Sequence, residues 1–424
     1  MRKTSVVVVG GGLAGLVAAR RLAAAGCSVT LYERRETVGG RVQSREQDGF
    51  VLDRGFQVLF TAYPAVQAEL DLDALDLRPF KPGAVIARPG ERSTLSDPLR
   101  DPAALFESLL NREITFTDKV RTLALRQDLA ERPPASFFSG HDTTIAEYLD
   151  EWGFSQSYIQ NFISPFYGGI TLDRSLSTSK EVFAYTFKML STGQIALPAA
   201  GMGAIADQLA EAAQTEGVRI ETGDPVNSIE ETCRHAVVDT EHDRRKADAV
   251  VVATSPKAAM RLTGVESIPT EAVGSVTQYY RHPTDVPLDT GNRLVLNAAN
   301  ASPNTVVPLS SIAPEYGTDD AELLCATFLG SAAQSRSDVA LAADTREALA
   351  SWYPERSFEG LEPIATDRIP FSQFAQPPGF FESLPDVRSP DGRCYLAGDY
   401  TRWSSIQGAM ESGQVAANAV LEDQ

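Results

Sequence analysis

The chain has 424 residues and a formal net charge of −18, from 38 basic and 56 acidic residues. A chain of this length exceeds one ordinary hydrophobic core, so two domains are expected. The negative charge argues against nucleic acid as a partner, because phosphate contacts require a positive surface. Only seven of the basic residues are lysines. This acid-rich, lysine-poor composition predicts a halophilic protein, since concentrated salt screens the repulsion between carboxylates.

The positions of cysteine and histidine argue against disulfides and metal sites. The cysteines lack C-x-x-C spacing and the histidines lack paired ligand spacing, so we expect reduced, buried thiols of a cytoplasmic protein and no metal. No apolar window approaches the length of a membrane-spanning helix, although peripheral contact with a membrane stays open. The residues concerned are Cys27, Cys233, Cys325, Cys394, His141, His235, His242 and His282.

The N-terminal segment admits two interpretations. The run VVVVGGGLAGLVAARRLAAAGCSVTLYER, residues 6–34, follows Arg2 and Lys3 and resembles a secretory leader. Arg20 and Arg21 argue against a leader, because two adjacent charges would fall inside its apolar core. The alternative is a buried strand, a glycine turn, a helix and a second strand, as in a dinucleotide-binding unit.

The glycine spacing favours the nucleotide interpretation. Gly10, Gly12 and Gly15 fit G-x-G-x-x-G, in which the glycines permit a tight turn, close approach of a pyrophosphate and close helix packing. The helix that begins at Leu13 and Ala14 would offer unpaired N–H groups and the positive end of its dipole to the phosphates.

An acid and a second glycine turn follow the second strand. Glu33 stands near the spacing expected for an acid that accepts both ribose hydroxyls, and its charge disfavours NADP because it would repel a 2′-phosphate. Arg34 comes next and is included among the candidate cofactor-binding residues. Gly39, Gly40 and Arg41 then provide a second turn beside the phosphates and a cation able to pair with them.

The middle of the chain changes from a helical to a nucleotide-type pattern. Residues 97–192 are predicted to be helical, with many aromatic side chains that form core and could line an apolar pocket. Residues 204–213 are then predicted as a helix that Gly217 ends. The predicted strands around it are residues 218–220, 226–229 and 247–254.

The last third is predicted to be rich in strands. Residues 274–371 favour an antiparallel sheet with polar turns, interrupted by a helix near residues 338–352. A final strand ends at Gly398 and Asp399, before a helix that begins at about Ile406. One face of this helix carries small residues, which permit close packing against another element.

These elements predict an α/β fold with a Rossmann-type cofactor-binding domain built from three segments, and an inserted α+β substrate domain with an antiparallel sheet and helices. The cofactor-binding segments are residues 1–80, 195–265 and 385–424, and the substrate-domain segments are residues 81–194 and 266–384.

The motifs and their order resemble those of the FAD-dependent amine oxidase and phytoene desaturase superfamily over essentially the whole chain. They are the glycine turn with Glu33, Gly39-Gly40-Arg41, LPAAGM, ADAVVVAT and YLAGDYT…IQGAMESG. The resemblance implies that the cofactor is FAD. By the same resemblance, further FAD-binding residues are Val226 at the adenine, Gly398 and Asp399 at the ribityl and pyrophosphate region, and Ile406 to Ala409 at the flavin ring.

Within the superfamily, two stretches indicate the kind of substrate. GDYT, which begins at Gly398, resembles the carotene desaturases of plant type, and SPFYGG, residues 164–169, resembles desaturases and protoporphyrinogen oxidases. The resemblance implies an oxidoreductase that takes a hydride from an apolar, isoprenoid- or carotenoid-like substrate onto flavin N5. Oxygen or a quinone would accept the electrons. Such chemistry depends on positioning more than on a strong base, so no catalytic residue is named.

Two departures from the superfamily bear on the chemistry. Amine oxidases of this fold carry a lysine near N5, whereas this chain has Gln278 at the apparent position and no lysine after Lys257. The TRWSSIQ loop has no cysteine, so FAD is expected to be bound non-covalently. Trp403 in that loop is a candidate for an aromatic side chain above the flavin, or for simple packing.

Alternatives remain in two classes. One is an amine oxidase or an enzyme similar to protoporphyrinogen oxidase. The other is a lipid-binding carrier without flavin chemistry, similar to the GDP-dissociation inhibitors. The intact glycines with Glu33 and Asp399 argue against the carrier. The oligomeric state is not predicted.

Overall fold

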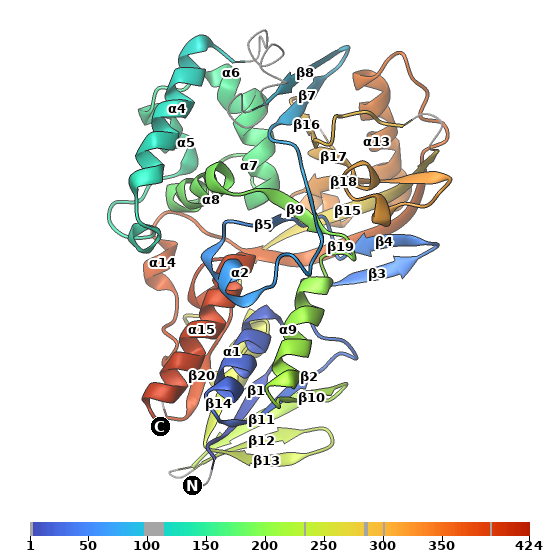
Figure 1. Ribbon diagram of the computed structural model, residues 1–424. Coiled ribbons are helices and arrows are strands. Elements are labelled where there is room, and N and C mark those ends of the chain that lie inside the picture. The colour runs from blue at the N-terminus through green and yellow to red at the C-terminus, as the bar shows by residue number, and fades with distance from the viewer. Residues whose placement is uncertain (1–2, 97–113, 233–234, 284–286, 300–301, 391) are drawn as a thin grey trace.

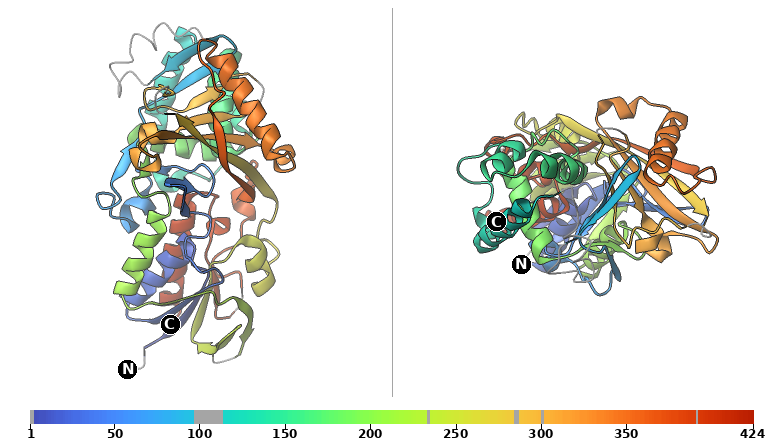
Figure 2. Two further views of the ribbon diagram at one scale, coloured as in Figure 1. Left: turned by 90° about the vertical axis from the view of Figure 1, so that its right-hand side faces the viewer. Right: turned by 90° about the horizontal axis from the view of Figure 1, so that it is seen from above.

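The computed structural model describes residues 3–96, 114–232, 235–283, 287–299, 302–390 and 392–424. The molecule is elongated, with a parallel sheet in one half and a larger mixed sheet beside a group of helices in the other (Figure 1, Figure 2). Among the described residues, no helix is long and apolar enough to cross a bilayer.

The parallel sheet is the framework of the first half. In the described chain it contains β10, β2, β1, β14 and β20 in that order. Its central strands consist of apolar residues because both faces are covered, and Val8 has no exposed surface. The bounds of these strands are Arg219–Thr222, Ser28–Glu33, Ser5–Val9, Ala249–Val252 and Cys394–Leu396.

Helices cover one face of this sheet and a small antiparallel sheet covers the other (Figure 2). Tyr32 on β2 joins the two sheets, because its hydroxyl donates to Asp243 at 2.8 Å. The helices are α1 (Leu13–Ala24), α9 (Ala204–Thr215) and α15 (Ile406–Glu422). The second layer contains β11 (Val226–Glu231), β12 (Ala236–Thr240), β13 (Arg244–Ala247) and α10 (Pro256–Thr263).

The mixed sheet has the strand order β19, β15, β18, β17, β16, β7, β8 among the described residues. It is antiparallel as expected, except that β16 runs parallel to β7, with Val295 opposite Val85. Helix α13 (Asp338–Trp352) packs on one face. The strand bounds in sheet order are Glu362–Phe374, Ala272–Pro283, Ala321–Leu329, Thr305–Pro308, Val295–Asn297, Ala84–Arg88 and Glu91–Leu95.

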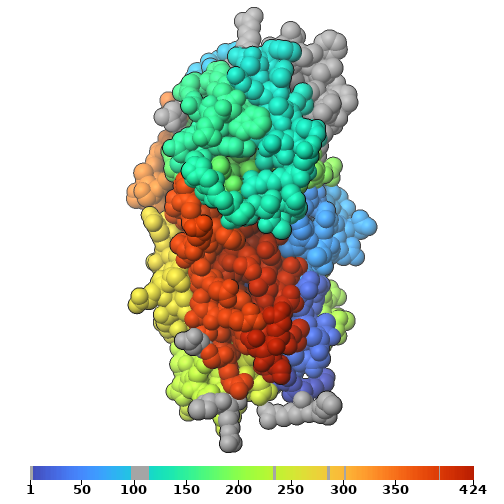
Figure 3. All heavy atoms as spheres, turned by 90° about the vertical axis from the view of Figure 1, so that its left-hand side faces the viewer, coloured from blue at the N-terminus to red at the C-terminus, as the bar shows by residue number. Residues whose placement is uncertain are grey.

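A helical layer lies beside the mixed sheet, and Figure 3 shows it directly above the C-terminal segment. Helices α4 and α5 begin with capping boxes, in which Thr115 and Thr144 exchange hydrogen bonds with Asp118 and Glu147. The bounds are α4 Phe116–Glu131, α5 Ile145–Glu151, α6 Gln156–Tyr158, α7 Ser164–Thr171 and α8 Lys180–Thr192, with a π-helical stretch, Ile159–Ile163, before α7.

Short elements fill the junction between the two halves. Asp53, at the end of β4, contacts residues of both halves. The strands are β3 (Ser44–Gln47), β4 (Phe50–Asp53), β5 (Leu59–Phe60), β6 (Leu77–Pro79) and β9 (Ile195–Pro198). Helix α2 (Pro64–Glu69) also lies at this junction. Helices α11 (Leu309–Ile312) and α12 (Ser331–Gln334) pack on strands of the mixed sheet, and α14 (Phe380–Ser383) contacts Phe138 of the helical layer.

The predicted element positions are confirmed where the structure describes the chain. The strand, turn, helix and strand of residues 6–34 form as in the nucleotide interpretation, and α9, α13 and α15 begin where predicted. Part of the helical prediction, residues 97–113, and Cys233 lie outside the described residues. The domain boundaries at residues 80, 194, 265 and 384 stay a prediction.

Candidate cofactor site

The first glycine turn is closed on its inner side and open on its outer side. A Cβ added to Gly10, whose φ is +107°, would lie 2.6 Å from the Ala253 carbonyl oxygen. A Cβ on Gly15 would lie 2.0 Å from the Gly10 oxygen. Gly12 has no atom within 4 Å of such a Cβ, so its outer face has room for a ligand. Gly10 and Gly15 thus permit close packing inside the turn, and Gly12 leaves space outside it, as expected of a turn that a pyrophosphate approaches.

The N-terminus of α1 opens toward the same space. Gly12 is the N-cap and contributes no side-chain hydrogen bond, and no acidic residue stands in the first turn. The backbone N–H groups of Leu13 and Ala14 therefore lack helical partners and carry the positive end of the helix dipole. Such a terminus is suited to a phosphate.

The second glycine turn lies against the first. Gly39 N–H donates to the Gly11 oxygen at 2.7 Å. A Cβ on Gly40, whose φ is +63°, would lie 3.3 Å from the Gly12 Cα. The two loops are 27 residues apart in the chain at Gly12 and Gly39, yet they form one continuous wall.

Glu33 closes one end of this wall. Its side chain is buried, with 7% exposure, and its Oε2 accepts from Gly11 N–H at 2.8 Å. Its Oε1 accepts from Arg35 N–H at 3.0 Å. A carboxylate has about four acceptor positions, so both oxygens keep capacity for ribose hydroxyls. Arg34 is exposed, whereas Arg35 donates to the Gly40 carbonyl at 2.9 Å. The cofactor contact of Arg34 stays a prediction, and the sequence did not indicate that Arg35 braces the second turn.

Arg41 and Asp399 form an ion pair that sequence reasoning did not predict. Arg41 Nη2 lies 2.6 Å from Asp399 Oδ1, and Nη1 donates to the Ser372 carbonyl at 3.0 Å. Asp399 Oδ2 accepts from the Ser404 hydroxyl at 2.7 Å. Arg41, predicted as a phosphate partner, thus pairs with a carboxylate in this structure and keeps three of its five N–H donors for another group. Gly398 donates its N–H to the Ser412 hydroxyl at 2.8 Å, which fixes the loop on α15.

The N-terminus of α15 is partly capped. Ser405 Oγ accepts from Gly408 N–H at 2.8 Å, and Ala409 N–H donates to the Ser405 carbonyl at 3.0 Å. Of the four positions predicted to approach the flavin, only Ile406 and Gln407 therefore keep N–H groups without helical partners. The Gln407 side chain accepts from Ala65 N–H at 2.9 Å and ties the helix to α2.

Trp403 belongs to an aromatic cluster beside this helix terminus. It is only 3% exposed, and its ring centroid lies 5.3 Å from that of Tyr185 and 5.6 Å from that of Phe138. Close packing therefore explains its position. The cluster joins the helical layer to the C-terminal segment, and its members are Tyr63, Phe137, Phe138, Tyr185, Phe380, Phe381 and Trp403.

Val226 is the first residue of β11 and is nearly buried. Its carbonyl accepts a long hydrogen bond from the Arg261 guanidinium at 3.4 Å. The neighbouring Asp224 N–H donates to the Glu33 carbonyl at 3.1 Å. Strand β11 therefore begins beside Glu33, the residue expected to bind the ribose. Its predicted contact with an adenine stays a prediction.

The half of the molecule that contains the parallel sheet and the candidate cofactor site is called the cofactor half. The side chain of Gln278 does not face it, contrary to the sequence interpretation. Its Nε2 donates to the Asp338 carbonyl of α13 at 3.1 Å, and Tyr280 donates to its Oε1. Because side chains alternate along a strand, Thr277 and Tyr279 take the opposite face. Thr277 Oγ1 accepts from Phe56 N–H at 3.1 Å. The side chain of β15 that faces the cofactor half at this point is therefore that of Thr277, not Gln278.

Asp53 is a buried carboxyl group at the junction. It accepts hydrogen bonds from Ser44, from Met202 N–H and from Tyr316 at 2.6, 2.8 and 2.9 Å. Burial raises the pKa of Asp53 to about 6, although these three hydrogen bonds act in the opposite direction. Neither the sequence motifs nor their spacing marked this residue.

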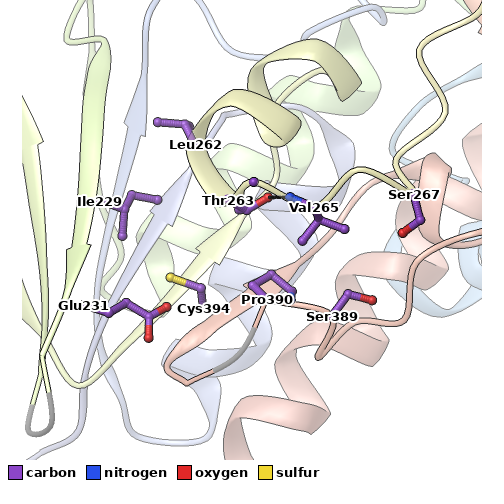
Figure 4. A pocket seen from close by; sticks show the side chains of 10 residues that line it. Ile229, Glu231, Leu262, Thr263, Val265, Ser267, Ser389, Pro390 and Cys394 are labelled. Atoms are coloured by element: carbon purple, nitrogen blue, oxygen red, sulfur yellow. Dashed lines mark hydrogen bonds between the residues drawn. The ribbon is translucent and has the colours of Figure 1, made fainter.

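The pocket of about 730 Å³ in Figure 4 lies away from these residues. It includes Cys394, the first residue of β20, whereas Gly398 and Asp399 follow the other end of that strand. In open α/β sheets the cofactor binds at the carboxyl ends of the strands, so this pocket is not the cofactor site. The described residues contain no group of side chains suited to a metal ion.

The chain matches the family described as flavin containing amine oxidoreductase over residues 13–421. It belongs to this family. A curated relative of this flavin-containing protein is 15-cis-phytoene desaturase of Synechococcus elongatus, which is 24% identical over 99% of this chain and 96% of the relative. Expectations of an FAD-dependent oxidoreductase and of a Rossmann-type α/β fold are thus confirmed. The family also favours an enzyme over the carrier alternative.

Two solved structures share the fold of this oxidoreductase over its full length. A protein of Exiguobacterium sp. 255-15, described as a candidate protoporphyrinogen oxidase, has a TM-score of 0.73 at 19% identity and covers 100% of both chains. Putrescine oxidase bound to putrescine has a TM-score of 0.72 at 20% identity and covers 99% of each chain. At these identities the similarity shows the fold alone.

Proposed function

We propose that this protein is an FAD-dependent oxidoreductase that removes a hydride from an apolar, isoprenoid- or carotenoid-like substrate, with oxygen or a quinone as the final electron acceptor. The aromatic cluster around Trp403 carries the proposal, because two of its rings, Phe138 and Phe381, keep exposed apolar surface while they pack beside Trp403 and the N-terminus of α15. The full-length similarity to a phytoene desaturase supports the same class of substrate.

The residues present fit a non-covalently bound FAD. The open face at Gly12 and the uncapped N-terminus of α1 suit the diphosphate, and Glu33 suits the adenosine ribose. Asp399 would meet the ribityl chain, and Val226 would meet the adenine. Residues 399–409 contain no cysteine, so no thioether attachment is available there. We assign the cofactor-binding and substrate domains to the segments bounded at residues 80, 194, 265 and 384.

When bound, FAD supplies a two-electron acceptor that takes a hydride at N5. The part of this chain is to position the substrate, exclude water and stabilise the added negative charge. Ile406 and Gln407 present backbone N–H groups at the positive end of α15, which is worth about half an elementary charge. The buried aromatic rings keep water out of the space beside them.

An amine oxidase or an enzyme similar to protoporphyrinogen oxidase is the alternative. Its support is the shared fold with the putrescine oxidase and the Exiguobacterium protein. The described part of the chain after Lys257 contains no lysine that could hold a water at the flavin, which favours the apolar substrate.

Product analysis tests the proposal. The holoenzyme is incubated with a polyene precursor and a quinone, and the product is expected to have two hydrogens fewer and a longer conjugated chromophore. Trp403→Leu should lower the rate, because it removes the ring against which Phe138 packs, with ring centroids 5.6 Å apart. Trp352→Leu is the matched control, since Trp352 is equally buried but packs on the far face of the mixed sheet. Conversion of amines with no change in the polyene would refute the proposal.

A further inference from the structure

Three buried polar atoms behind α7 have no hydrogen-bond partner. They are Arg174 Nη1, Asn304 Oδ1 and Thr327 Oγ1. Asn304 is 3% exposed and Thr327 is 5% exposed. Buried polar groups in native proteins are almost always satisfied, and each exception calls for a water, an ion or a ligand.

A chain of hydrogen bonds brings these three residues together. Arg174 Nη2 donates to the Asn297 carbonyl at 3.1 Å, and Asn297 N–H donates to the Asn304 carbonyl at 3.1 Å. Asn304 N–H in turn donates to the Thr327 carbonyl at 2.8 Å. Asn304 Nδ2 donates to the Pro165 carbonyl of α7 at 3.0 Å, so its Oδ1 is held in a fixed orientation. These bonds place Arg174, Asn304 and Thr327 next to one another between α7 and the mixed sheet.

Gly168 of α7 allows this close approach, whereas Gly169 is only at ordinary contact distance from the site. A Cβ on Gly168 would lie 2.6 Å from Arg174 Cγ, and one on Gly169 would lie 3.5 Å from Asn304 Nδ2. A larger side chain at Gly168 would displace the arginine. The SPFYGG stretch therefore has a local function here, which is to admit the polar side chains beneath the helix.

The site lies on the sheet face that turns toward the cofactor half. Thr327 on β18 is in register with Thr277 on β15, whose hydroxyl accepts from Phe56 N–H. Arg54, two residues earlier, donates to the Gly40 carbonyl at 3.1 Å. Contacts from Gly40 to Arg54, and from Phe56 to Thr277, thus connect the second glycine turn to the residue that lies opposite Thr327 in the sheet.

The positive charge of Arg174 indicates that a ligand of this site is an anion. Among the described residues no carboxylate pairs with Arg174, and burial alone lowers the pKa of its guanidinium. Arg174 is partly buried and its Nη1 atom is fully buried. A desolvated cationic group without a counter-charge is costly, and a bound carboxylate would offset that cost through charge-assisted hydrogen bonds. An ammonium group would be repelled by Arg174.

We propose that Arg174, Asn304 and Thr327 form a subsite for a carboxylate at one end of an otherwise apolar substrate. Arg174 Nη1–H and the Thr327 hydroxyl donate to the carboxylate, and Asn304 Oδ1 accepts from a water or hydroxyl beside it. The inference rests on the proposed function, because it names the polar end of the same substrate.

The test compares three probes of equal chain length on the holoenzyme: dodecanoate, dodecanol and dodecylamine. Binding is followed by the shift of the flavin absorbance bands. Wild type should bind dodecanoate at least tenfold more tightly than the other two. Arg174→Gln should remove this preference and leave dodecanol binding unchanged. Arg346→Gln is the matched control, because Arg346 also donates to a backbone carbonyl but lies on α13, across the sheet.

Thr327→Val is the second variant and should weaken dodecanoate binding severalfold, which keeps the test valid if Arg174→Gln fails to fold. Equal affinities of wild type for dodecanoate and dodecanol would overturn the subsite, as would dodecanoate binding that Arg174→Gln leaves unchanged. In both cases dodecanol binding would leave the proposed function standing. If no probe binds, the apolar substrate and the subsite are both refuted.

Discussion

Glu33 is a buried carboxylate that orders two backbone segments and keeps free acceptor positions. Glu33→Ala removes a charged hydrogen-bond partner and should weaken FAD binding by about 1–3 kcal/mol. Titration of the apoprotein with FAD measures the loss. Glu33→Gln is the control, because its amide oxygen can still accept from Gly11 N–H. An unchanged dissociation constant for Glu33→Ala would contradict the ribose assignment.

Asp53 should make stability depend on pH. Its pKa of about 6 in the folded state lies above the usual value of 3.8, so the folded state holds its proton more tightly. The stability from this proton is present below about pH 4 and is lost as pH rises through about pH 6. A shift of this size corresponds to about 3 kcal/mol.

Urea unfolding of wild type and Asp53→Asn at pH 4 to 7 isolates this effect. The free energy of unfolding of wild type should fall by about 2 to 2.5 kcal/mol relative to the variant over that range, because the unfolded state is already partly deprotonated at pH 4. Parallel curves for the two proteins would show that Asp53 titrates normally.

Some residue roles depend on contacts that no local pattern encodes. Arg41 and Asp399 are 358 residues apart, so a phosphate was the natural partner to assign to Arg41 from sequence. Gln278 was placed by its motif, but the face it occupies depends on pairing with β19, which shifts register on both sides of it. The unpartnered atoms of Arg174, Asn304 and Thr327 likewise emerge only when α7 packs on the sheet.

At the scale of elements, the small residues of α15 decide how closely it approaches α1. A Cβ on Gly413 would lie 2.3 Å from the Ala14 carbonyl oxygen and 3.0 Å from Val17 Cβ. Gly413→Ala should therefore lower stability by about 1–3 kcal/mol, despite the better helix propensity of alanine.

Thermal unfolding measures this change as a lower midpoint for Gly413→Ala. Asn418→Ala on the same helix is the control, because Asn418 is exposed, and it should leave the midpoint nearly unchanged. A midpoint for Gly413→Ala at or above that of wild type would show that α15 and α1 can move apart without loss of stability.

Element positions were the most predictable level because their signals are local. Apolar runs, glycine stops and capping residues located α1, α9, α13 and α15 within one or two residues. The parallel β7–β16 pair was not predicted, since it joins residues 85 and 295 across a long separation. The partial capping of α15 by Ser405 was also missed, although a serine before a helix is a recognisable signal.

For the whole molecule, the charge of −18 predicts a dependence on salt. Crowded carboxylates repel one another in the compact state, and ions screen this repulsion. The surface ion pairs that salt also weakens contribute little each. The thermal unfolding midpoint should therefore rise from low to molar sodium chloride. A flat or falling midpoint would contradict the prediction of a halophilic protein.

An oxidoreductase of this family that acts on an apolar molecule should have its bound flavin reduced by such a molecule under anaerobic conditions. Without oxygen, a true substrate bleaches the oxidised flavin band whichever acceptor the cell uses. We expect bleaching by a polyene precursor or another lipid-like compound, and none by benzylamine, spermine or amino acids. Rapid bleaching by any of these amines, with the polyene inert, would contradict the proposed apolar substrate.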